Sequence, residues 1–157
     1  MRHLTHALAA AAAFAFALVW AAPGHAGEAK AAIKTHHIVF QVDQNNPAVM
    51  NLVLNNVSNL LEYYHHKGEQ ADIEVVAFGP GLNMLRDDKS PVKDRLKRLK
   101  EGSFPSELTY SACHNTMMGM EKKEGHPIKI VSEARVVPAG VARVTELEEQ
   151  GWSYIRP

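Results

Sequence analysis

The sequence predicts an α/β protein of three layers, in which helices cover both faces of a mainly parallel sheet of about five strands. Short apolar runs alternate along the chain with longer segments whose apolar side chains recur at helical spacing. The loops between them are short, so each strand passes quickly into a helix that can cross back over the sheet. The strand runs are apolar on both alternating faces, as strands covered on two sides must be.

The first 26 residues have the layout of a cleavable secretory signal peptide. A positive charge at Arg2 precedes an uncharged apolar run over residues 8–20, and Gly24 and Ala26 are small residues three and one before the expected cut. The apolar run is shorter than the roughly 20 residues that span a bilayer. We therefore expect an exported precursor, periplasmic or secreted, whose mature part at 27–157 is a single domain without a membrane anchor.

Charge and cysteine usage narrow the range of functions. The chain has 17 basic and 17 acidic residues, and removal of Arg2 with the leader leaves 16 against 17, a net charge of −1. Such a balance favours neither nucleic acid nor an acidic membrane as a partner. Cys113 is the only cysteine. In an exported domain it is therefore a lone thiol or bonds to another chain, because it has no partner for an internal disulfide.

The first half of the domain predicts two strand–helix units. Asn46-Pro47 has the pattern of a helix start, because asparagine caps free N–H groups and proline fits the first helical position. Ser90-Pro91 repeats this pattern, and the basic residues that follow it are expected to form a solvated face. The expected elements are a strand at 37–42, a helix from 47 that Gly68 ends, a strand at 73–78, a short turn at 82–86 and a helix at 91–101.

The second half predicts a third strand that leads straight into a helix through Cys113-His114-Asn115-Thr116. Gly125 and Gly151 follow helical segments and have the residue type that commonly ends a helix. Across the whole sheet, we expect Val39, Val76 and Phe78 to be buried on central strands. The expected elements are a strand at 108–112, a helix that ends near 125, strands at 127–131 and 135–137, a helix at 141–150 and a last strand at 152–155.

Ligands in open α/β sheets collect beyond the carboxyl ends of the strands, where the strand order reverses. If the first strand lies between the second and the third, this reversal places Cys113 at the mouth of a crevice. Free N–H groups and the positive end of the helix dipole favour a thiolate there, so Cys113 is predicted to be a partly exposed, activated nucleophile. The residues that could support it from the strand ends are Asp43, Gly79, Gly81, Asn83, His114 and Asn115.

Each of these features also has a plainer interpretation. Cys113 could be a small buried hydrophobe, as free cysteine often is. Gly79 and Gly81 suit a tight turn as well as a close backbone approach to a ligand. Met117 and Met120 fall at i+4 and i+7 from Cys113, and thiolate with thioether selects copper(I), but the same spacing describes a core stripe. Core packing is the favoured interpretation of the methionines, and no metal is expected.

Three stretches of the sequence resemble the DsrE/DsrF-like family of sulfur-relay proteins. They are Val75 to Gly81 with Leu85, Ser111 to Met117, and the ending from Val136 to Ala142 and from Gly151 to Pro157. Together with the first strand and helix they cover nearly the whole mature domain. The resemblance implies a flavodoxin-like fold, association into homo-oligomers, and a persulfide held on Cys113 that passes to or from a partner protein.

These observations support two classes of function. The first is a sulfur carrier or sulfurtransferase-like protein without a cofactor, which holds a persulfide on Cys113. The alternative is a non-catalytic module that binds a small ligand or copper(I), or an interaction subunit of the same fold. The aromatic rings of Trp152 and Tyr154 could supply an interface between copies, or could pack on their own domain.

Overall fold

The computed structural model describes residues 32–157 of the chain. The predicted signal peptide lies outside these residues. Within them, no helix is long and apolar enough to cross a membrane. The described part consists of five strands, four α-helices and one 3-10 helix: β1 (Thr35–Val42), α1 (Pro47–His66), β2 (Gln70–Ala77), η1 (Gly79–Leu85), α2 (Lys93–Glu101), β3 (Leu108–Cys113), α3 (His114–Glu124), β4 (Ala134–Val137), α4 (Gly140–Glu149) and β5 (Ser153–Ile155).

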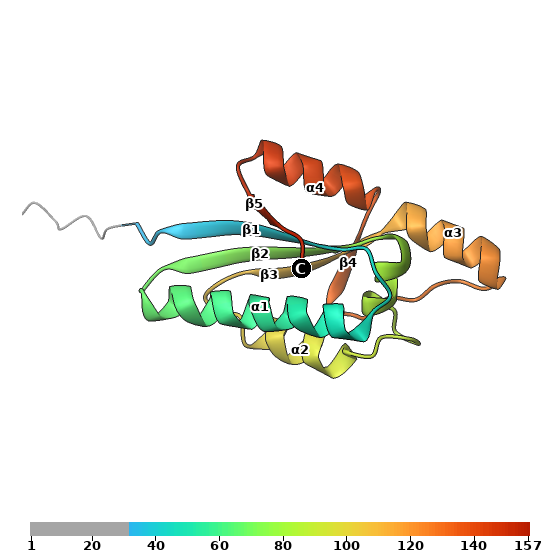
Figure 1. The fold of residues 1–157 in the computed structure, drawn as a ribbon, viewed down its shortest axis with the longest axis horizontal. Helices are drawn as coiled ribbons and strands as arrows, with labels where there is room; N and C mark the ends of the chain where they lie inside the picture. Colours follow the sequence, from blue (N-terminus) through green and yellow to red (C-terminus); the bar gives the residue numbers. More distant parts are fainter. Residues whose placement is uncertain (1–31) are drawn as a thin grey trace, which may run out of the picture. The chain divides into compact units, whose positions relative to one another are not determined.

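The five strands form one parallel sheet in the order β4-β3-β2-β1-β5. The chain steps from β1 through β4 in one direction, and α4 then carries it back to place β5 beside β1. Because parallel crossovers are right-handed, opposite directions of travel put their helices on opposite faces. Figure 1 shows this arrangement, with α1 and α2 on one face of the sheet and α4 on the other. The predicted three-layer α/β class is confirmed.

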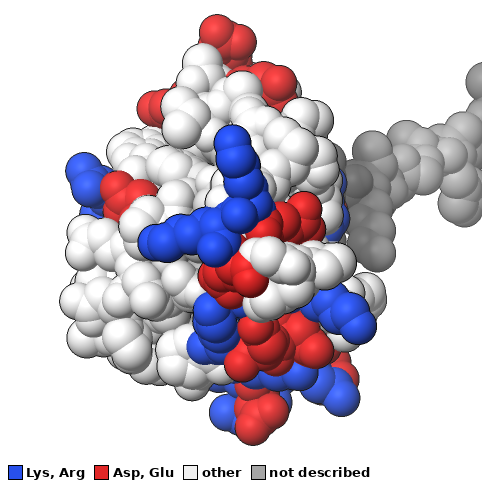
Figure 2. All heavy atoms as spheres, turned by 90° about the vertical axis from the view of Figure 1, so that its right-hand side faces the viewer, with Lys and Arg blue, Asp and Glu red and all other residues white. Residues whose placement is uncertain are grey.

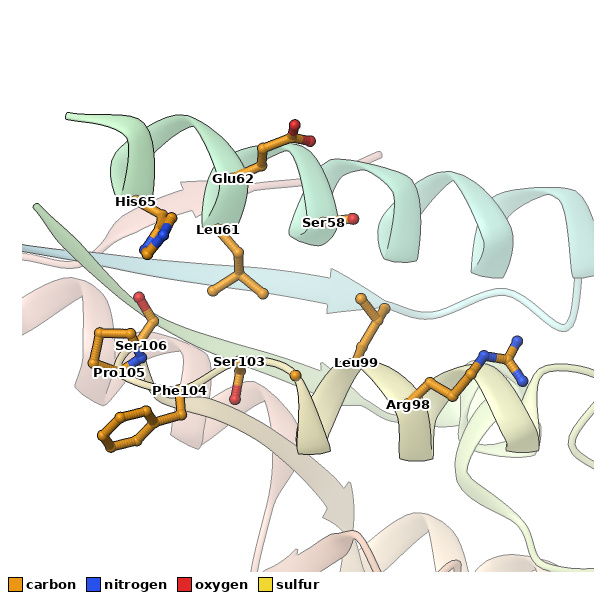
Figure 3. Close-up of a pocket in the computed structure, with 11 residues that line it drawn as sticks. Ser58, Leu61, Glu62, His65, Arg98, Leu99, Ser103, Phe104, Pro105 and Ser106 are labelled. Carbon is orange, nitrogen blue, oxygen red and sulfur yellow. The ribbon is translucent and has the colours of Figure 1, made fainter. Parts of the chain in front are cut away.

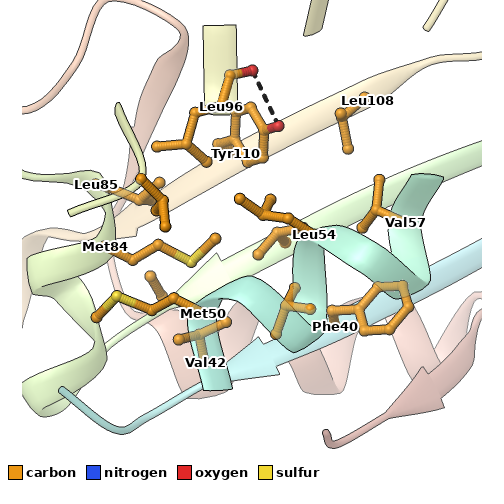
Figure 4. Packing of buried hydrophobic residues seen from close by; sticks show 14 of the residues in the cluster. Phe40, Val42, Met50, Leu54, Val57, Met84, Leu85, Leu96, Leu108 and Tyr110 are labelled. Atoms are coloured by element: carbon orange, nitrogen blue, oxygen red, sulfur yellow. Dashed lines mark hydrogen bonds between the residues drawn. The ribbon is translucent and has the colours of Figure 1, made fainter. Parts of the chain in front are cut away.

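The main core lies between the sheet and the α1–α2 layer (Figure 4). Phe40 on β1, Leu54 on α1 and Leu96 on α2 are fully buried in it. Each such side chain stabilises the fold by about 1.5–3 kcal/mol relative to exposure. Tyr110 of β3 is also fully buried, and its hydroxyl donates to the Leu96 carbonyl at 3.1 Å, which satisfies the polar end of the ring.

The face beneath α4 has a smaller core and a buried charge. Val39 and Val76 are buried here, as predicted, and they pack against α4. Trp152 lies partly buried against the same cluster. Beside them Glu74 is 2% exposed and accepts hydrogen bonds from Arg135, Arg143 and the Ser111 hydroxyl. This side of the sheet is therefore held by ion pairs as well as apolar contacts.

Three local predictions are wrong. Phe78 lies one residue beyond β2 and is only partly buried, because the chain turns there into η1. The second helix begins at Lys93, because the Ser90 hydroxyl bonds Met84 O and accepts from Val92 N, which holds the preceding residues in a turn.

Residues 127–131 do not form a strand of the sheet. Proline at 127 has no N–H, and the next amide, of Ile128, donates to the Glu121 carboxylate at 3.0 Å. Val131 N–H donates to Leu85 O at 2.9 Å, so the segment is tied to the end of η1. Its single ladder contact is an isolated antiparallel bridge between Ile130 and Arg86.

Candidate functional site

Cys113 is the last residue of β3 and the N-cap of α3, at the carboxyl edge of the sheet. Its neighbour on β4 is Val137, and the start of α4 lies directly beyond that strand. A Cβ built on Gly140, the first residue of α4, would lie 3.2 Å from the Cys113 Cβ. The cysteine is therefore packed between the first turns of two helices, α3 and α4.

The thiol is buried rather than partly exposed, which corrects the prediction. Cys113 is 5% exposed, and Gly140 at the start of α4 packs against it. Phe78 stands so close to Gly140 that an added Cβ there would meet its Cβ and Cδ1 at 2.9 Å. The absence of a side chain at position 140 is what leaves room for the cysteine in this corner.

Hydrogen-bond donors nevertheless favour the charged form of the sulfur. Burial raises the pKa of the Cys113 thiol, but the Thr116 hydroxyl and the backbone N–H groups of Gly140, Thr116 and Asn115 lower it. The net pKa lies below the ordinary value. The sulfur accepts no cap hydrogen bond of standard geometry from its own helix. The groups that lower its pKa therefore act as nearby polar donors. The backbone groups lie in the first turns of two helices, where N–H groups have no partner within the helix.

Thr116 connects the cysteine to the end of β2. The Gly79 N–H donates to Thr116 Oγ1 at 2.9 Å, and Thr116 lies half-buried one turn into α3. Gly79 has a φ of 51°, in the left-handed region that favours glycine. The glycine conformation thus aims a backbone N–H at the Thr116 hydroxyl, which is among the groups that lower the pKa of the thiol.

The two residues that follow the cysteine differ in what they bring to the site. The side chains of His114 and Asn115 are both exposed on the first turn of α3. Asn115 contributes through its backbone, since its N–H donates to Pro138 O at 3.3 Å and also lies near the sulfur. The structure therefore brings the backbone of this tripeptide to the site and leaves the His114 ring at the surface.

The predicted supporting residues on the first strand lie elsewhere. Asp43 follows β1, which β2 separates from β3, so about 10 Å of sheet lies between the two strand ends. Its carboxylate accepts from Arg156 at 2.8 Å and from Gln41 at 3.0 Å. The reversal of strand order lies here, between β1 and β5. The order that placed Cys113 at the reversal is wrong, because β5 rather than β3 returns to the free side of β1.

The remaining turn residues have structural roles. A Cβ on Gly81 would lie 2.2 Å from Val42 O and 2.8 Å from Asp43 N, so the close backbone approach is to β1 of the same chain. The Asn83 side chain donates to Pro80 O at 3.0 Å and stabilises η1 from within. Of the six supporting residues predicted, Gly79 and Asn115 contact the site, both through the backbone.

The methionines of α3 pack toward the protein. Met117 and Met120 are partly buried against the main core cluster, and the Met120 sulfur lies 3.8 Å from Arg86 Nη1. Within residues 32–157, no group of three or more His, Cys, Asp or Glu side chains is placed to hold a metal. Met117 and Met120 therefore contribute to the packing of α3 against the core.

An ion-pair cluster fixes the far end of α3. The Arg86 side chain is 1% exposed and makes bidentate contacts with Glu124 at 2.6 and 2.9 Å and with Asp88 at 2.9 and 2.7 Å. Hydrogen bonds from Arg86 and Lys89 lower the pKa of Glu124 to about 2. Figure 2 views this end of the molecule and shows basic and acidic side chains intermingled, without a broad field of one sign.

Two of the hollows in residues 32–157 have partly apolar linings, and Cys113 lines neither of them. One, of about 280 Å³, is at the amino ends of the strands, between Leu61 on α1, Leu99 on α2 and the loop of Phe104 (Figure 3). Another, of about 300 Å³, lies between the edge strand β4 and α4, with Pro138 and Ala142 among its lining residues. Only the second adjoins the strand beside Cys113.

Sequence reasoning missed the residues that surround the sulfur most closely. Thr116 stands three residues after the N-cap, the spacing at which a helix side chain reaches back toward its own cap. Gly140 follows a strand and opens a helix, a position where glycine permits close approach. Both signals were present in the sequence, but the proximity of the second depends on the pairing of β3 with β4.

No family model matches the chain, and no curated protein matches it. Among solved structures, the chain is similar to a protein of unknown function, MTH1491, from Methanobacterium thermoautotrophicum. The two share 29% sequence identity and superpose with a TM-score of 0.65, and the match covers 78% of this chain and 99% of the other. The α/β domain therefore has a counterpart that consists almost entirely of the same fold.

Proposed function

We propose that the protein is an exported DsrE-like sulfur carrier, sulfurtransferase-like in its chemistry, that holds a persulfide on Cys113. The observation that carries the proposal is the setting of the thiol, whose pKa is lowered by donors at the starts of α3 and α4. A thiolate is the form of cysteine that attacks sulfane sulfur. The resemblance of the sequence to sulfur-relay proteins names the same residue for the same chemistry.

The proposed step balances without a cofactor. The Cys113 thiolate attacks the sulfane sulfur of a thiosulfate-type donor, a new sulfur–sulfur bond forms, and the old one breaks. Sulfite leaves with the bonding electron pair, and the terminal sulfur of the new persulfide carries the negative charge. With a small persulfide as donor, a thiolate leaves instead. Delivery reverses the step, with the thiolate of an acceptor protein as the attacking group.

The site favours a small, anionic donor. Cys113 is 5% exposed and packs against Gly140, so a bulky donor has no direct approach to the sulfur. The positive ends of the two helix dipoles, at the starts of α3 and α4, attract negative charge. The same helix ends would stabilise the anionic outer sulfur of the persulfide after transfer.

The experiment is the intact mass of the mature protein after incubation with thiosulfate or cysteine persulfide. We expect the mass of one added sulfur atom, lost on treatment with cyanide or a thiol. Cys113→Ser should keep the fold and take up no sulfur. A wild-type protein that gains no sulfur from either donor, or a Cys113→Ser protein that gains as much, contradicts the proposal and leaves the binding-module alternative.

Export and self-association belong to the same proposal. A mature protein that begins near Gly27 in envelope fractions would support export, and retention of Met1 there would contradict it. For self-association, Val136 on the edge strand β4 and Val141 at the start of α4 are 48% and 61% exposed, and Tyr154 is 39% exposed. Val136 and Val141 fit an interface between copies at the β4 edge, and Tyr154 lies at the opposite edge of the sheet, on β5. Sedimentation that shows only monomer at micromolar concentration would contradict it.

A further inference from the structure

We infer that the hollow between β4 and α4 binds the anionic end of the sulfur donor, and that Arg135 and Arg143 recognise it. The ligand is a small molecule with a carboxylate or sulfonate group, as in an amino-acid persulfide or thiosulfate. The inference rests on the proposed function, because it names the part of the donor that the protein holds while the sulfane sulfur reaches Cys113. The arginines bind the donor and take no part in the transfer itself.

The first step of the argument is the position of Arg135 on the sheet. Ser111 and Cys113 are two residues apart on β3, so their side chains point to the same face. Ser111 pairs with Val76, which packs against α4, so this is the α4 face. Arg135 is the β4 neighbour of Ser111, and its Nε donates to Ser111 Oγ at 3.2 Å. This bond holds the guanidinium beside Ser111, about 7 Å along the strand from the cysteine.

The second step is the facing side of α4. Gly140 and Arg143 are three residues apart, so both lie on one face of the helix. Gly140 packs against Cys113, and Arg143 donates to both oxygens of Glu74 at 2.9 and 2.7 Å. The same helix face therefore covers the cysteine at its first residue and holds a guanidinium one turn further along.

The third step is a count of hydrogen-bond donors and acceptors. The Glu74 carboxylate accepts four hydrogen bonds, which fills its lone pairs. They come from Ser111, from Arg135 and twice from Arg143. Each guanidinium has five N–H groups and uses two of them on Glu74 or Ser111. Since no other acceptor in residues 32–157 lies within hydrogen-bond distance of either guanidinium, three N–H groups on each remain for a ligand.

The fourth step is the charge around the arginines. Burial raises the pKa of Glu74, but hydrogen bonds from Arg143 and Ser111 and the charge of Arg135 lower it below its ordinary value. One charged carboxylate therefore faces two guanidiniums. Glu146 is the other acidic residue that lines the hollow, and its carboxylate is 59% exposed and 3.7 Å from Arg143 Nη1. An anion in the hollow replaces this loose contact, and the Glu146 side chain turns to solvent.

The fifth step is the choice between two hollows that both arginines line. One, of about 200 Å³, is also lined by Asp72, Glu74 and Glu107, which repel an anion. The other is the hollow of about 300 Å³ between β4 and α4, at the lower end of the range for small-ligand sites. Glu146 is its one acidic lining residue. The anion is therefore expected in the second hollow.

The lining of this hollow also selects what the anion is attached to. Away from the charged residues its wall is made by apolar side chains, those of Val136, Val137, Pro138, Ala139 and Ala142. Such a wall suits a short stem of carbon or sulfur atoms. Residues 138 and 139 lead directly to Gly140, which packs against Cys113. A donor held by its anionic end at the arginines thus extends toward the cysteine.

The test is isothermal titration calorimetry on Cys113→Ser protein, which keeps the arginines and takes up no sulfur. The probes are thiosulfate and methylthiopropionate, an unreactive carboxylate in which a methyl group replaces the outer sulfur of a small persulfide. The neutral control is methylthiopropionamide. We expect the anions to bind and the amide not to bind. Binding of only one anion identifies the donor as a thiosulfate or a persulfide, whereas binding of neither, or of the amide as tightly as its acid, overturns the inference.

Variants of the charged residues give opposite expected signs. Arg135→Gln removes the more exposed guanidinium and should weaken anion binding roughly tenfold, as for loss of a hydrogen bond between charged groups. Arg135→Lys keeps the charge without the planar fork and should recover part of the loss. Glu146→Gln removes the competing carboxylate and should tighten binding roughly twofold, the scale of an exposed ion pair.

The matched control is Arg95→Gln on α2, which lies on the opposite face of the sheet (Figure 1). Arg95 is also fixed by side chains, since its Nη1 donates to Asn51 Oδ1 at 2.8 Å. We expect no change in anion binding there. Unchanged affinity in a folded Arg135→Gln protein, or an equal loss in Arg95→Gln, overturns the inference. If Arg135→Gln does not fold, Glu146→Gln decides, and binding there that is no tighter than in its parent overturns it.

The binding assay separates this inference from the proposed function, because it uses protein without the thiol. Anion binding that Arg135→Gln weakens, together with no sulfur uptake by the wild type, would retain the anion site and contradict the carrier. Sulfur uptake that is equally fast in the wild type and Arg135→Gln, at donor concentrations below saturation, would retain the carrier and overturn the anion site.

Discussion

Replacement of Gly140 by alanine tests the close packing around the cysteine. Gly140 is the buried first residue of α4, and the new Cβ would lie 2.9 Å from both Cβ and Cδ1 of Phe78 and 3.2 Å from the Cys113 Cβ. The atoms in the way include Phe78 Cβ, which cannot move without its backbone. The variant therefore forces α4 away from the ends of β2 and β3.

The magnitude is a balance of two effects. Overpacking of a well-filled site costs about 1–3 kcal/mol, and a contact with a Cβ atom puts Gly140→Ala toward the upper part of that range. Alanine in place of glycine recovers about 1 kcal/mol, because it restricts the unfolded chain and favours the helix. The free energy of unfolding should therefore fall by about 1–2 kcal/mol, roughly a tenfold change in the folding equilibrium.

Urea denaturation followed by circular dichroism measures this difference. The matched control is Gly119→Ala, at an exposed position inside α3, where an added Cβ meets nothing within 4 Å. It should stabilise the protein by about 0.5–1 kcal/mol through helix propensity alone. The two alanines thus have opposite expected signs. If Gly140→Ala is as stable as Gly119→Ala, the narrow corner around Cys113 does not exist in solution.

Three further predictions concern the frame of the site. Gly81→Ala would place a Cβ 2.2 Å from the Val42 carbonyl oxygen, so we expect no folded species by circular dichroism, and a stable protein would be inconsistent with this turn. Glu74→Gln should lower the free energy of unfolding by about 2 kcal/mol. Breaking a fully buried pair costs about 3–5 kcal/mol, and the loss here is smaller because both arginine partners reach solvent. An unchanged urea midpoint would refute this expectation. The Arg86 contact holds the pKa of Glu124 at about 2, against 4.5 for a free carboxyl, so the stabilisation from this ion pair is complete above pH 4.5 and is lost as pH falls toward 2. Glu124→Gln should therefore lose less stability than the wild type between pH 4.5 and 2. Equal losses would exclude this ion pair as a cause of the acid sensitivity.

The sequence predicted the class of fold because that class depends on local patterns. The order of strands and helices follows from apolar spacing, caps and glycine turns, and five strands alternate with helices as expected. The strand order does not follow from such patterns. Whether β3 or β5 occupies the free side of β1 depends on which crossover packs better over the sheet. The apolar residues of α4 settle it, since Val144 and Leu147 cover Val39 and Val76.

The candidate site was predicted in part for the same reason. Cys113 at the junction of β3 and α3 could be placed from sequence, because a strand run meets a helix start there. Its burial could not, since Phe78 follows β2 and Gly140 begins α4, and only the sheet brings these two residues together. The arginine that anchors α3 was missed as well. Arg86 is fully buried, against the usual preference of its residue type. Sequence could not indicate this, because its partner Glu124 lies 38 residues away along the chain.

The helix that begins at the cysteine has no fully buried residue, and Figure 1 shows it extending past the carboxyl ends of the strands. A segment with so little packing opens at a lower free energy than the strands of a central sheet. Backbone amides of α3 should therefore exchange with deuterium well before those of β1 to β3, once the Thr116 and Glu124 contacts at its two ends break. Such a local opening would uncover the sulfur while the sheet stays folded, so the rate of any reaction at Cys113 becomes the product of an opening equilibrium and a chemical step.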